Sequence, residues 1–292
     1  MRRLNTDLTI SPWPGTVVGY ESGLFPGGEV HFRIPGELYS TEWVISVNIR
    51  NSDDIMLLLL ATDALRRLGA DSIRLRMPYC AYARQDRVTA PGEAFSLKVF
   101  ASVINAQNYR SVVCLDPHSN ACECLIDRLH IVPQVKLAEM ALGKIDNYNK
   151  RIAIVAPDLG AHKKAMELAL KWKCPLVQAS KHRDPLTGEL SDPQILFGPL
   201  PTEIDHLLMV DDICDGGRTF LHLNKVLKER YPNIPQSLYI THGIFSNGLA
   251  ALSEAFSNVI TANCLLDALK AGVGSLYILE SANIITLMEN AQ

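Results

Sequence analysis

The sequence contains no apolar run long enough to cross a membrane. Its longest run, IMLLLLA at residues 55–61, is soon followed by Asp63 and Arg66, whereas a membrane-spanning helix needs about 20 apolar residues. Residues 1–15 hold two arginines but no apolar core of the length that a signal peptide has. We therefore expect a cytoplasmic protein with no membrane partner.

Excess positive charge and paired cysteines are also missing. The 28 Lys and Arg residues are outnumbered by 31 Asp and Glu residues, for a net charge of −3, so no general basic field favours nucleic acid as a partner. The seven cysteines are odd in number and spread along the chain, which does not indicate a disulfide framework. Cys122 and Cys124 lack a second pair at zinc-finger spacing, so we expect reduced thiols.

Short β-branched runs alternate with longer helical patterns along the chain. This alternation predicts an α/β fold with two mostly parallel sheets, each flanked by helices. We expect a first domain over residues 1–145 and a second over 146–292, whose end is a candidate to pack back on the first. The predicted strands cover 42–49, 72–79, 111–116, 151–158, 206–212 and 237–243, and the predicted helices 53–69, 93–107, 161–173 and 219–231. Between the halves, the polar segment 139–151 is interpreted as a boundary.

Acidic residues stand where three of the predicted strands end. One strand ends at Asp116 with His118 just beyond it, another ends at Asp158, and a third ends at Asp211 and Asp212. Ligands of open α/β sheets bind outside the carboxyl ends of the strands. One acid at a strand end is ordinary turn chemistry, but three acids with a histidine indicate a candidate site at this edge.

The segment DGGRT follows the last of these strands and precedes a helix. Gly216, Gly217 and Thr219 can form a cradle of backbone N–H groups for an anion, to which the helix N-terminus adds partial positive charge. Asp211 and Asp212 would repel a phosphate, but each carboxylate can accept hydrogen bonds from a vicinal diol. Ribose with a 5-phosphate satisfies both halves. The alternative interpretation is an Asx-type turn in front of a helix cap near Thr219.

The segment VDDICDGGRT, residues 210–219, resembles the ribose-phosphate loop V-D-D-I-x-D-T-G-G-T of type I phosphoribosyltransferases and ribose-phosphate pyrophosphokinases. PYCAYARQDR, residues 78–87, resembles P-Y-x-x-Y-A-R-Q-D-R, an ATP-site signature of the pyrophosphokinases alone. A phosphoribosyltransferase would lack that signature and a second domain. Five further segments resemble the pyrophosphokinases in family order: FPGGE (25–29), FSLKVFASVI (95–104), CLDPHS (114–119), VAPDLGAHKKA (155–165) and THGIFSNGLAAL (241–252).

The chain is thereby identified as a member of the ribose-phosphate pyrophosphokinase family, with two phosphoribosyltransferase-type domains. The resemblance implies Mg²⁺-dependent transfer of the β,γ-diphosphoryl group of ATP to the C1 hydroxyl of ribose 5-phosphate, giving phosphoribosyl pyrophosphate (PRPP) and AMP. It also implies a homo-oligomer, dimer or hexamer, because a neighbouring subunit completes the adenine pocket in this family. The implied ATP-binding residues are Phe25, Glu29, Arg84, Gln85 and His118, and the implied ribose-phosphate residues are Asp211, Asp212, Asp215, Gly216, Gly217, Arg218 and Thr219.

The resemblance also implies catalytic and metal-binding residues. SKHRDP, beginning at Ser180, matches the family's catalytic loop D-K-R-R-P and gives Lys181 and Arg183 as the charges on the transferred group. His118 and Asp158 match the family's magnesium-contacting positions. A histidine is an unusual ligand for magnesium, so His118 could instead orient a water molecule or a phosphate.

Some ligand-contacting positions depart from the family pattern. Gly27 replaces an aspartate, Gly216 a threonine and Arg218 a glycine. An arginine at 218 could reach a second phosphate bidentately, as ADP-ribose would supply. One alternative is therefore the same transfer to ADP-ribose, giving ADP-ribose 1-pyrophosphate for NAD salvage. Another is a non-catalytic regulatory relative, which would lack the catalytic lysine or the metal residues.

Overall fold

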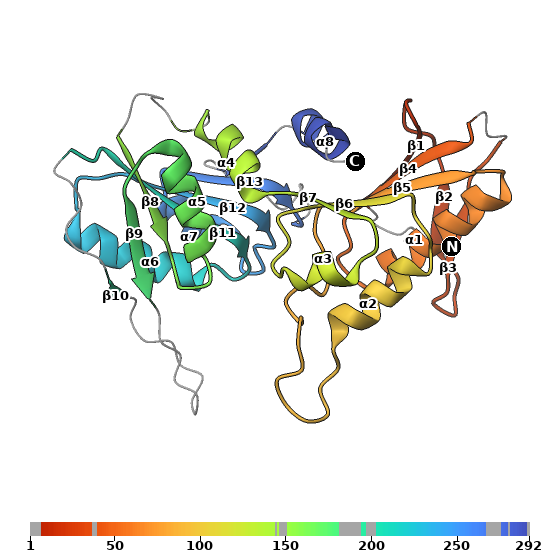
Figure 1. The fold of residues 1–292 in the computed structure, drawn as a ribbon, viewed down its shortest axis with the longest axis horizontal. Coiled ribbons are helices and arrows are strands. Elements are labelled where there is room, and N and C mark those ends of the chain that lie inside the picture. Colours follow the sequence, from red (N-terminus) through yellow and green to blue (C-terminus); the bar gives the residue numbers. More distant parts are fainter. Residues whose placement is uncertain are drawn as a thin grey trace. The chain divides into compact units, whose positions relative to one another are not determined.

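The computed structural model describes residues 7–36, 40–143, 145, 151–180, 194–196, 203–266, 276–279 and 281–290 of the chain. It divides into two compact units, one of Met1–Val132 with Ile285–Gln292 and one of Pro133–Ile284. Each unit has a mostly parallel sheet with helices packed alongside it (Figure 1). The predicted α/β fold is confirmed.

The sheet of the first unit has the strand order β1-β4-β5-β6-β7. Strand β1 is antiparallel to β4, and the other neighbours are parallel. A separate hairpin pairs β2 with β3. The elements are β1 Leu8–Pro12, β2 Glu21–Leu24, β3 Val30–Arg33, β4 Glu42–Val47, α1 Ser52–Arg67, β5 Ser72–Arg76, α2 Ser96–Asn105, β6 Ser111–Leu115, α3 Ala121–Leu125 and β7 Leu129–Val132.

Helix α1 shows how local sequence sets an element of this unit. The Asn51 side chain accepts a hydrogen bond from the Asp54 N–H and caps the first turn. Acidic residues in the first turn and arginines in the last complement the helix dipole. Leu58 and Leu65 are fully buried on the face that packs into the core. Gly69, with φ of 93°, then provides the left-handed residue that ends the helix.

The sheet of the second unit has the order β10-β9-β8-β11-β12-β13-β14, in which β10 is antiparallel to β9 and the other neighbours are parallel. Its core includes Val155, Met209 and Leu238 of the sheet with Phe220 and Leu227 of α6. The elements are α4 Gln134–Leu142, β8 Ile152–Ala156, α5 His162–Trp172, β9 Leu176–Ser180, β10 Gln194–Ile195, β11 His206–Cys214, α6 Arg218–Arg230, β12 Gln236–Gly243, α7 Ala250–Ala255, β13 Asn258–Cys264 and β14 Leu276–Ile278. Helix α8, Ser281–Asn290, begins in the second unit and belongs to the first from Ile285 onward.

Several sequence predictions about elements are wrong in detail. The strand predicted over 72–79 ends at Arg76, and the helix predicted over 93–107 begins at Ser96. The segment 139–151 was expected to be a polar boundary, but its first four residues belong to α4, because Leu137, Ala138 and Ala141 form a buried face at helical spacing. Strand β11 does not end at Asp212: it continues to Cys214, since its pairing with β12 continues to that residue.

All seven cysteines are free thiols. Cys80 and Cys122 are both buried, with their sulfur atoms 3.4 Å apart. Within the described ranges, no helix combines the length and the apolar character needed to cross a membrane.

Candidate functional site

The YARQDR segment forms a loop between β5 and α2. Arg84 and Gln85 are both exposed. The Gln85 N–H donates a hydrogen bond to the Tyr82 carbonyl at 3.0 Å, and the Gln85 carbonyl accepts one from the Leu97 N–H at 3.2 Å. Tyr82 has φ of 62°, so the turn is tight. The loop is therefore held against the first turn of α2 while two polar side chains reach solvent.

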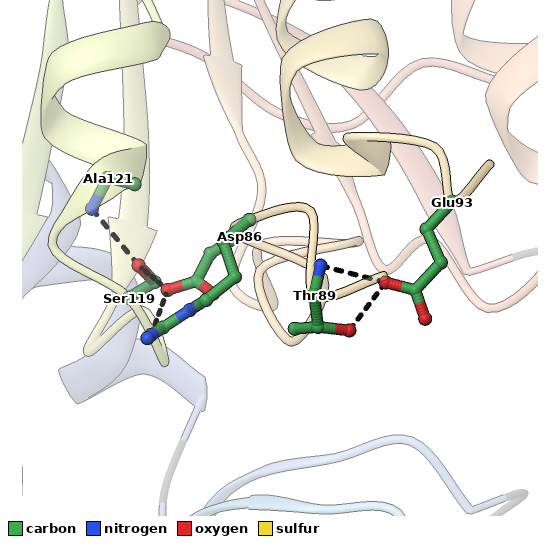
Figure 2. Close-up of polar contacts among 6 residues, drawn as sticks. Asp86, Thr89, Glu93, Ser119 and Ala121 are labelled. Carbon is green, nitrogen blue, oxygen red and sulfur yellow. Dashed lines mark hydrogen bonds and ion pairs between the residues drawn. The ribbon is translucent and has the colours of Figure 1, made fainter. Parts of the chain in front are cut away.

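Asp86 ties this loop to the loop that follows β6. Its carboxylate accepts hydrogen bonds from Arg87 Nε at 2.8 Å and from Ser119 Oγ at 2.7 Å. Ser119 Oγ in turn accepts the Ala121 N–H, as Figure 2 shows. These hydrogen bonds lower the pKa of Asp86 to about 2, and the bond from Arg87 has a larger effect than the bond from Ser119. Ser119 directly follows His118 in the chain.

His118 itself is exposed just beyond the end of β6. The Asp116 N–H donates to the Val132 carbonyl, and Asp116 has φ of 35°. This left-handed residue turns the chain sharply after the strand, and two residues later His118 reaches the surface. The strand end thus places His118 on the loop that Asp86 holds.

Phe25 and Glu29 lie at the turn between β2 and β3, and both are exposed. The Phe25 N–H donates to the Glu29 carbonyl at 2.9 Å. The Phe25 ring lies edge-on to the His31 ring, with 5.4 Å between the ring centroids. A Cβ atom at Gly27 would lie 2.6 Å from Glu29 Oε2. An aspartate at 27, as the family pattern has, would therefore force the Glu29 carboxylate to move.

In the second unit, Asp158 follows β8 and leads into α5. Its Oδ1 accepts the Ala161 N–H at 3.0 Å. Gln178 of β9 is buried and donates from Nε2 to the Asp158 carbonyl at 3.0 Å, while its Oε1 lies 2.5 Å from His162 Nδ1. Gln178 therefore fixes both ends of the Asp158 turn. Sequence reasoning missed it; a glutamine inside the apolar run LVQAS is the one local signal.

Asp211 and Asp212 lie where β11 extends past its neighbour β8. Strand β11 pairs with β8 as far as Met209, but with β12 as far as Cys214. The pKa of the Asp211 carboxyl is raised well above its ordinary value. Burial is the largest cause, and the negative charges of Asp212 and Asp158 add to it. Three acids are thus crowded at this edge, which favours a ligand that donates hydrogen bonds or a cation.

Asp212 is buried and paired with a cation. Lys164 Nζ of α5 lies 3.2 Å from Asp212 Oδ2, with the two side chains 29% and 11% exposed. The Asp212 N–H also donates to Asp211 Oδ1 at 2.8 Å. Lys164 was not among the predicted site residues, although it lies within the segment VAPDLGAHKKA.

Helix α6 begins directly after the glycine turn. Gly217 is its N-cap, with φ of 79°, and makes no side-chain hydrogen bond that caps the helix. Thr219 is the second residue of the helix, and Leu221 is the first residue whose N–H reaches back four positions, to the Gly217 carbonyl. The Phe220 N–H donates to the same carbonyl at 3.1 Å. The N–H groups of a helix's first turn point toward its N-terminal end.

A second segment, residues 245–248, covers the glycine turn. Ser246 Oγ donates to Asp215 Oδ1 at 2.7 Å, and Asn247 Nδ2 donates to the Gly216 carbonyl at 3.1 Å. A Cβ atom at Gly216 would lie 2.7 Å from Asn247 Nδ2, so the amide occupies the space that a threonine would need. Arg218 is exposed at the first position of α6. The motif THGIFSNG was recognised, but Ser246 and Asn247 were not predicted as site residues.

The predicted residues fall in both units. The first unit contains Phe25, Glu29, Arg84, Gln85 and His118. The second unit contains Asp158 and residues 211–219. Lys181 and Arg183 lie outside the described residues, so their roles stay predictions. In the part of the chain that the structure describes, no three His, Cys, Asp or Glu side chains are grouped so that they could hold a metal ion.

Comparison with known proteins gives matches to ribose-phosphate pyrophosphokinases. The model of the N-terminal domain of ribose phosphate pyrophosphokinase matches residues 16–107. The ribose-phosphate pyrophosphokinase of Rhizobium meliloti is 33% identical over 214 residues, 71% of this chain and 66% of that protein. The one from Granulibacter bethesdensis is 28% identical over 249 residues, 83% of this chain and 76% of that protein. The crystal structure of phosphoribosylpyrophosphate synthetase from Mycobacterium smegmatis shares the fold, with a TM-score of 0.77 at 21% identity, over 94% of this chain and 90% of that one.

Proposed function

Because the chain belongs to the ribose-phosphate pyrophosphokinase family of transferases, we propose that it transfers the β,γ-diphosphoryl group of ATP to the C1 hydroxyl of ribose 5-phosphate. The products are PRPP and AMP. The observation that carries this proposal is the edge of the second sheet, where the buried Asp212 and the half-buried Asp211 stand next to a glycine turn and a helix N-terminus. Few ligands other than a phosphorylated sugar suit both features.

The acceptor is recognised by two kinds of group. Asp212, held by Lys164, and Asp211, whose pKa is raised, accept hydrogen bonds from the ribose hydroxyls. The 5-phosphate lies against the backbone N–H groups from Asp215 to Thr219, at the positive end of the α6 dipole. The carboxylates exclude the phosphate from the diol end, so the sugar binds in one orientation.

ATP binds to residues of the first unit. Arg84 presents a guanidinium fork suited to phosphate oxygens, Gln85 adds a polar contact, His118 lies on the adjoining loop, and Phe25 and Glu29 border the adenine. Because this family's adenine pocket is completed by a neighbour, we also propose a homo-oligomer, a dimer or a hexamer, located in the cytoplasm.

We propose Mg²⁺ as the cofactor. Asp158 supplies the carboxylate oxygen that this ion prefers, at an edge where acids already repel one another. His118 is the other proposed ligand. Bound magnesium would draw negative charge from the phosphates during transfer. Lys181 and Arg183 would place positive charge on the transferred group, a role that rests on the match of SKHRDP to the family loop.

ADP-ribose is the second candidate acceptor, favoured by Arg218. Its guanidinium group stands exposed at the first position of α6, next to the glycine turn. A diphosphate-linked ribose carries a second phosphate beyond the one at C5, which an arginine fork can bind bidentately. The product would be ADP-ribose 1-pyrophosphate, an intermediate for NAD salvage. An ordinary 5-phosphate has no second phosphate for Arg218 to bind.

AMP release separates these candidates. Purified protein with ATP and magnesium is expected to form AMP only when an acceptor is added, and ribose 5-phosphate and ADP-ribose are compared at equal concentration. Arg218→Gly should shift the preference toward ribose 5-phosphate if the loop sets it. Gly216 is left unchanged, because Asn247 fills the space beside it. Absence of AMP with both acceptors would indicate the non-catalytic regulatory relative instead.

A further inference from the structure

A cavity of about 530 Å³ opens where the strands of the first sheet begin, at the opposite end of these strands from the ATP-site residues. Its lining includes Arg66, Asp71, Ile73, Asn108, Arg110 and Arg128. These residues precede or begin β5, β6 and β7, whereas the YARQDR loop and His118 follow the ends of β5 and β6. A five-residue strand is about 17 Å long, so the cavity is separate from the candidate ATP site.

Two of the three arginines are held in place by the turn between α2 and β6. Arg66 Nη2 donates to the Gln107 carbonyl. Arg128 donates from Nε to the Tyr109 carbonyl at 2.6 Å and from Nη2 to Asn108 Oδ1 at 2.9 Å. A guanidinium group has five N–H donors, so these bonds orient both groups and leave each with further donors.

Arg110 differs from the other two. It is exposed, and its guanidinium group makes no hydrogen bond or ion pair with any residue that the structure describes. Asp71, the acid that lines the cavity, likewise forms no ion pair within the described ranges. Three positive charges therefore face one negative charge, in a chain whose net charge is −3.

Holding the turn explains Arg66 and Arg128 but not Arg110. Asn108 in this turn has φ of 45°, and the hydrogen bonds that the two arginines donate to its carbonyls stabilise the turn. Removing Arg110 would leave all of these bonds intact. Its placement beside two oriented guanidinium groups is the arrangement that binds an oxyanion with several forked contacts.

We propose that this arginine cavity binds a small anion bearing phosphate groups. Its volume is that of a small-molecule site. The aromatic side chain in the lining, Tyr109, is buried, and its hydroxyl lies 2.7 Å from Thr62 Oγ1. Its ring offers no exposed face for a nucleobase to stack on, so the ligand class is phosphate, diphosphate or a phosphorylated sugar. This inference does not rest on the proposed function.

Arginine footprinting with inorganic diphosphate tests the proposal residue by residue. The protein is treated with phenylglyoxal with and without diphosphate, and modified arginines are quantified by peptide mass spectrometry. Diphosphate is expected to slow modification of Arg110 in proportion to its occupancy, while Arg67, which is paired with Asp63 on α1, is unaffected. Because the readout is per residue, diphosphate bound at the α6 turn cannot mimic this result. Equal Arg110 modification with and without diphosphate would overturn the proposal.

Calorimetry with matched variants gives a second readout. Arg110→Ala should weaken diphosphate binding at this site roughly tenfold, the usual effect of losing charge-assisted hydrogen bonds. Arg67→Ala should leave the affinity unchanged. Both residues are exposed, so folding should survive, and circular dichroism checks it. If Arg110→Ala binds diphosphate as tightly as the unmodified protein, the proposal is wrong.

Discussion

Lys164 and Asp212 form an ion pair, 3.2 Å from Nζ to Oδ2, that joins α5 to β11 at the edge of the second sheet. The pair makes the two neighbouring acids unequal. Lys164 holds the Asp212 carboxylate in place, whereas burial and the charges of Asp212 and Asp158 raise the pKa of Asp211. We infer that the proposed diol site combines one fixed carboxylate with one that gains a proton more readily.

Lys164→Ala should weaken acceptor binding. Without its cation, the buried Asp212 carboxylate keeps its desolvation cost and loses the group that holds it in place, so it is a poorer acceptor for the ribose hydroxyls. The free energy of unfolding should fall by about 1–2 kcal/mol, less than for a fully buried pair because Lys164 is partly exposed. Titration calorimetry with ribose 5-phosphate and denaturant unfolding measure the two effects. Lys163→Ala, an exposed neighbour on α5, is the control, and equal behaviour of the two variants would contradict the role.

Asp212→Asn should lower the affinity for the acceptor more than the affinity for ATP. The amide keeps the shape of the side chain but replaces one acceptor oxygen with a donor, so it no longer complements two hydroxyls. Calorimetry with each ligand separates the effects. The control is Glu229→Gln on the exposed surface of α6, which removes one charge without changing the acids at the edge of the second sheet. A loss of ATP affinity as large as the loss of acceptor affinity would count against the assignment.

Lys181→Ala should raise the barrier to transfer by about 3 kcal/mol or more, because positive charge on the transferring group acts mainly in the transition state. The free energy of unfolding should change little. The measurement is the rate of AMP formation at saturating ATP and acceptor, with Lys225→Ala as the control for an exposed lysine. Near-normal turnover of Lys181→Ala would remove it from the catalytic residues.

Asp86 should make stability depend on pH in the acid range. Its pKa is about 2 in the folded protein against an ordinary 3.8, so its contribution is present above 3.8 and is lost as the pH falls toward 2. Above that range, Asp86→Asn should lower the free energy of unfolding by about 1 kcal/mol, since Arg87 is exposed and screened. Denaturant unfolding of both proteins along a pH series gives the comparison. A gap that stayed constant as the pH fell would show that the charge of Asp86 is not its cause.

The sequence predicted the fold because its strands and helices are locally consistent. The 3.6-residue periodicity and the caps place α1, α5 and α6 within three residues of their observed ends. Likewise, Asp158 and Asp211 come close together because parallel neighbours such as β8 and β11 end at the same edge. Such relationships follow from strand order and direction, which the pattern reveals.

Side chains that support the site could not be predicted in the same way. Lys164 meets Asp212 across 48 positions of sequence, Gln178 meets the Asp158 turn across 20, and Asn247 reaches Gly216 across 31. Each contact depends on how elements pack, and no local pattern encodes it. Helix α4 was missed for a related reason: its last turn runs into a polar segment that hides its buried face.

The most direct measurement is ³¹P nuclear magnetic resonance of a mixture of protein, ATP, magnesium and ribose 5-phosphate. Transfer of an intact diphosphoryl group predicts that AMP and a new diphosphate bonded to the sugar's C1 oxygen appear in equal amounts, and that neither appears when the acceptor is omitted. Formation of ADP with a singly phosphorylated C1, or of AMP with free diphosphate, would contradict it.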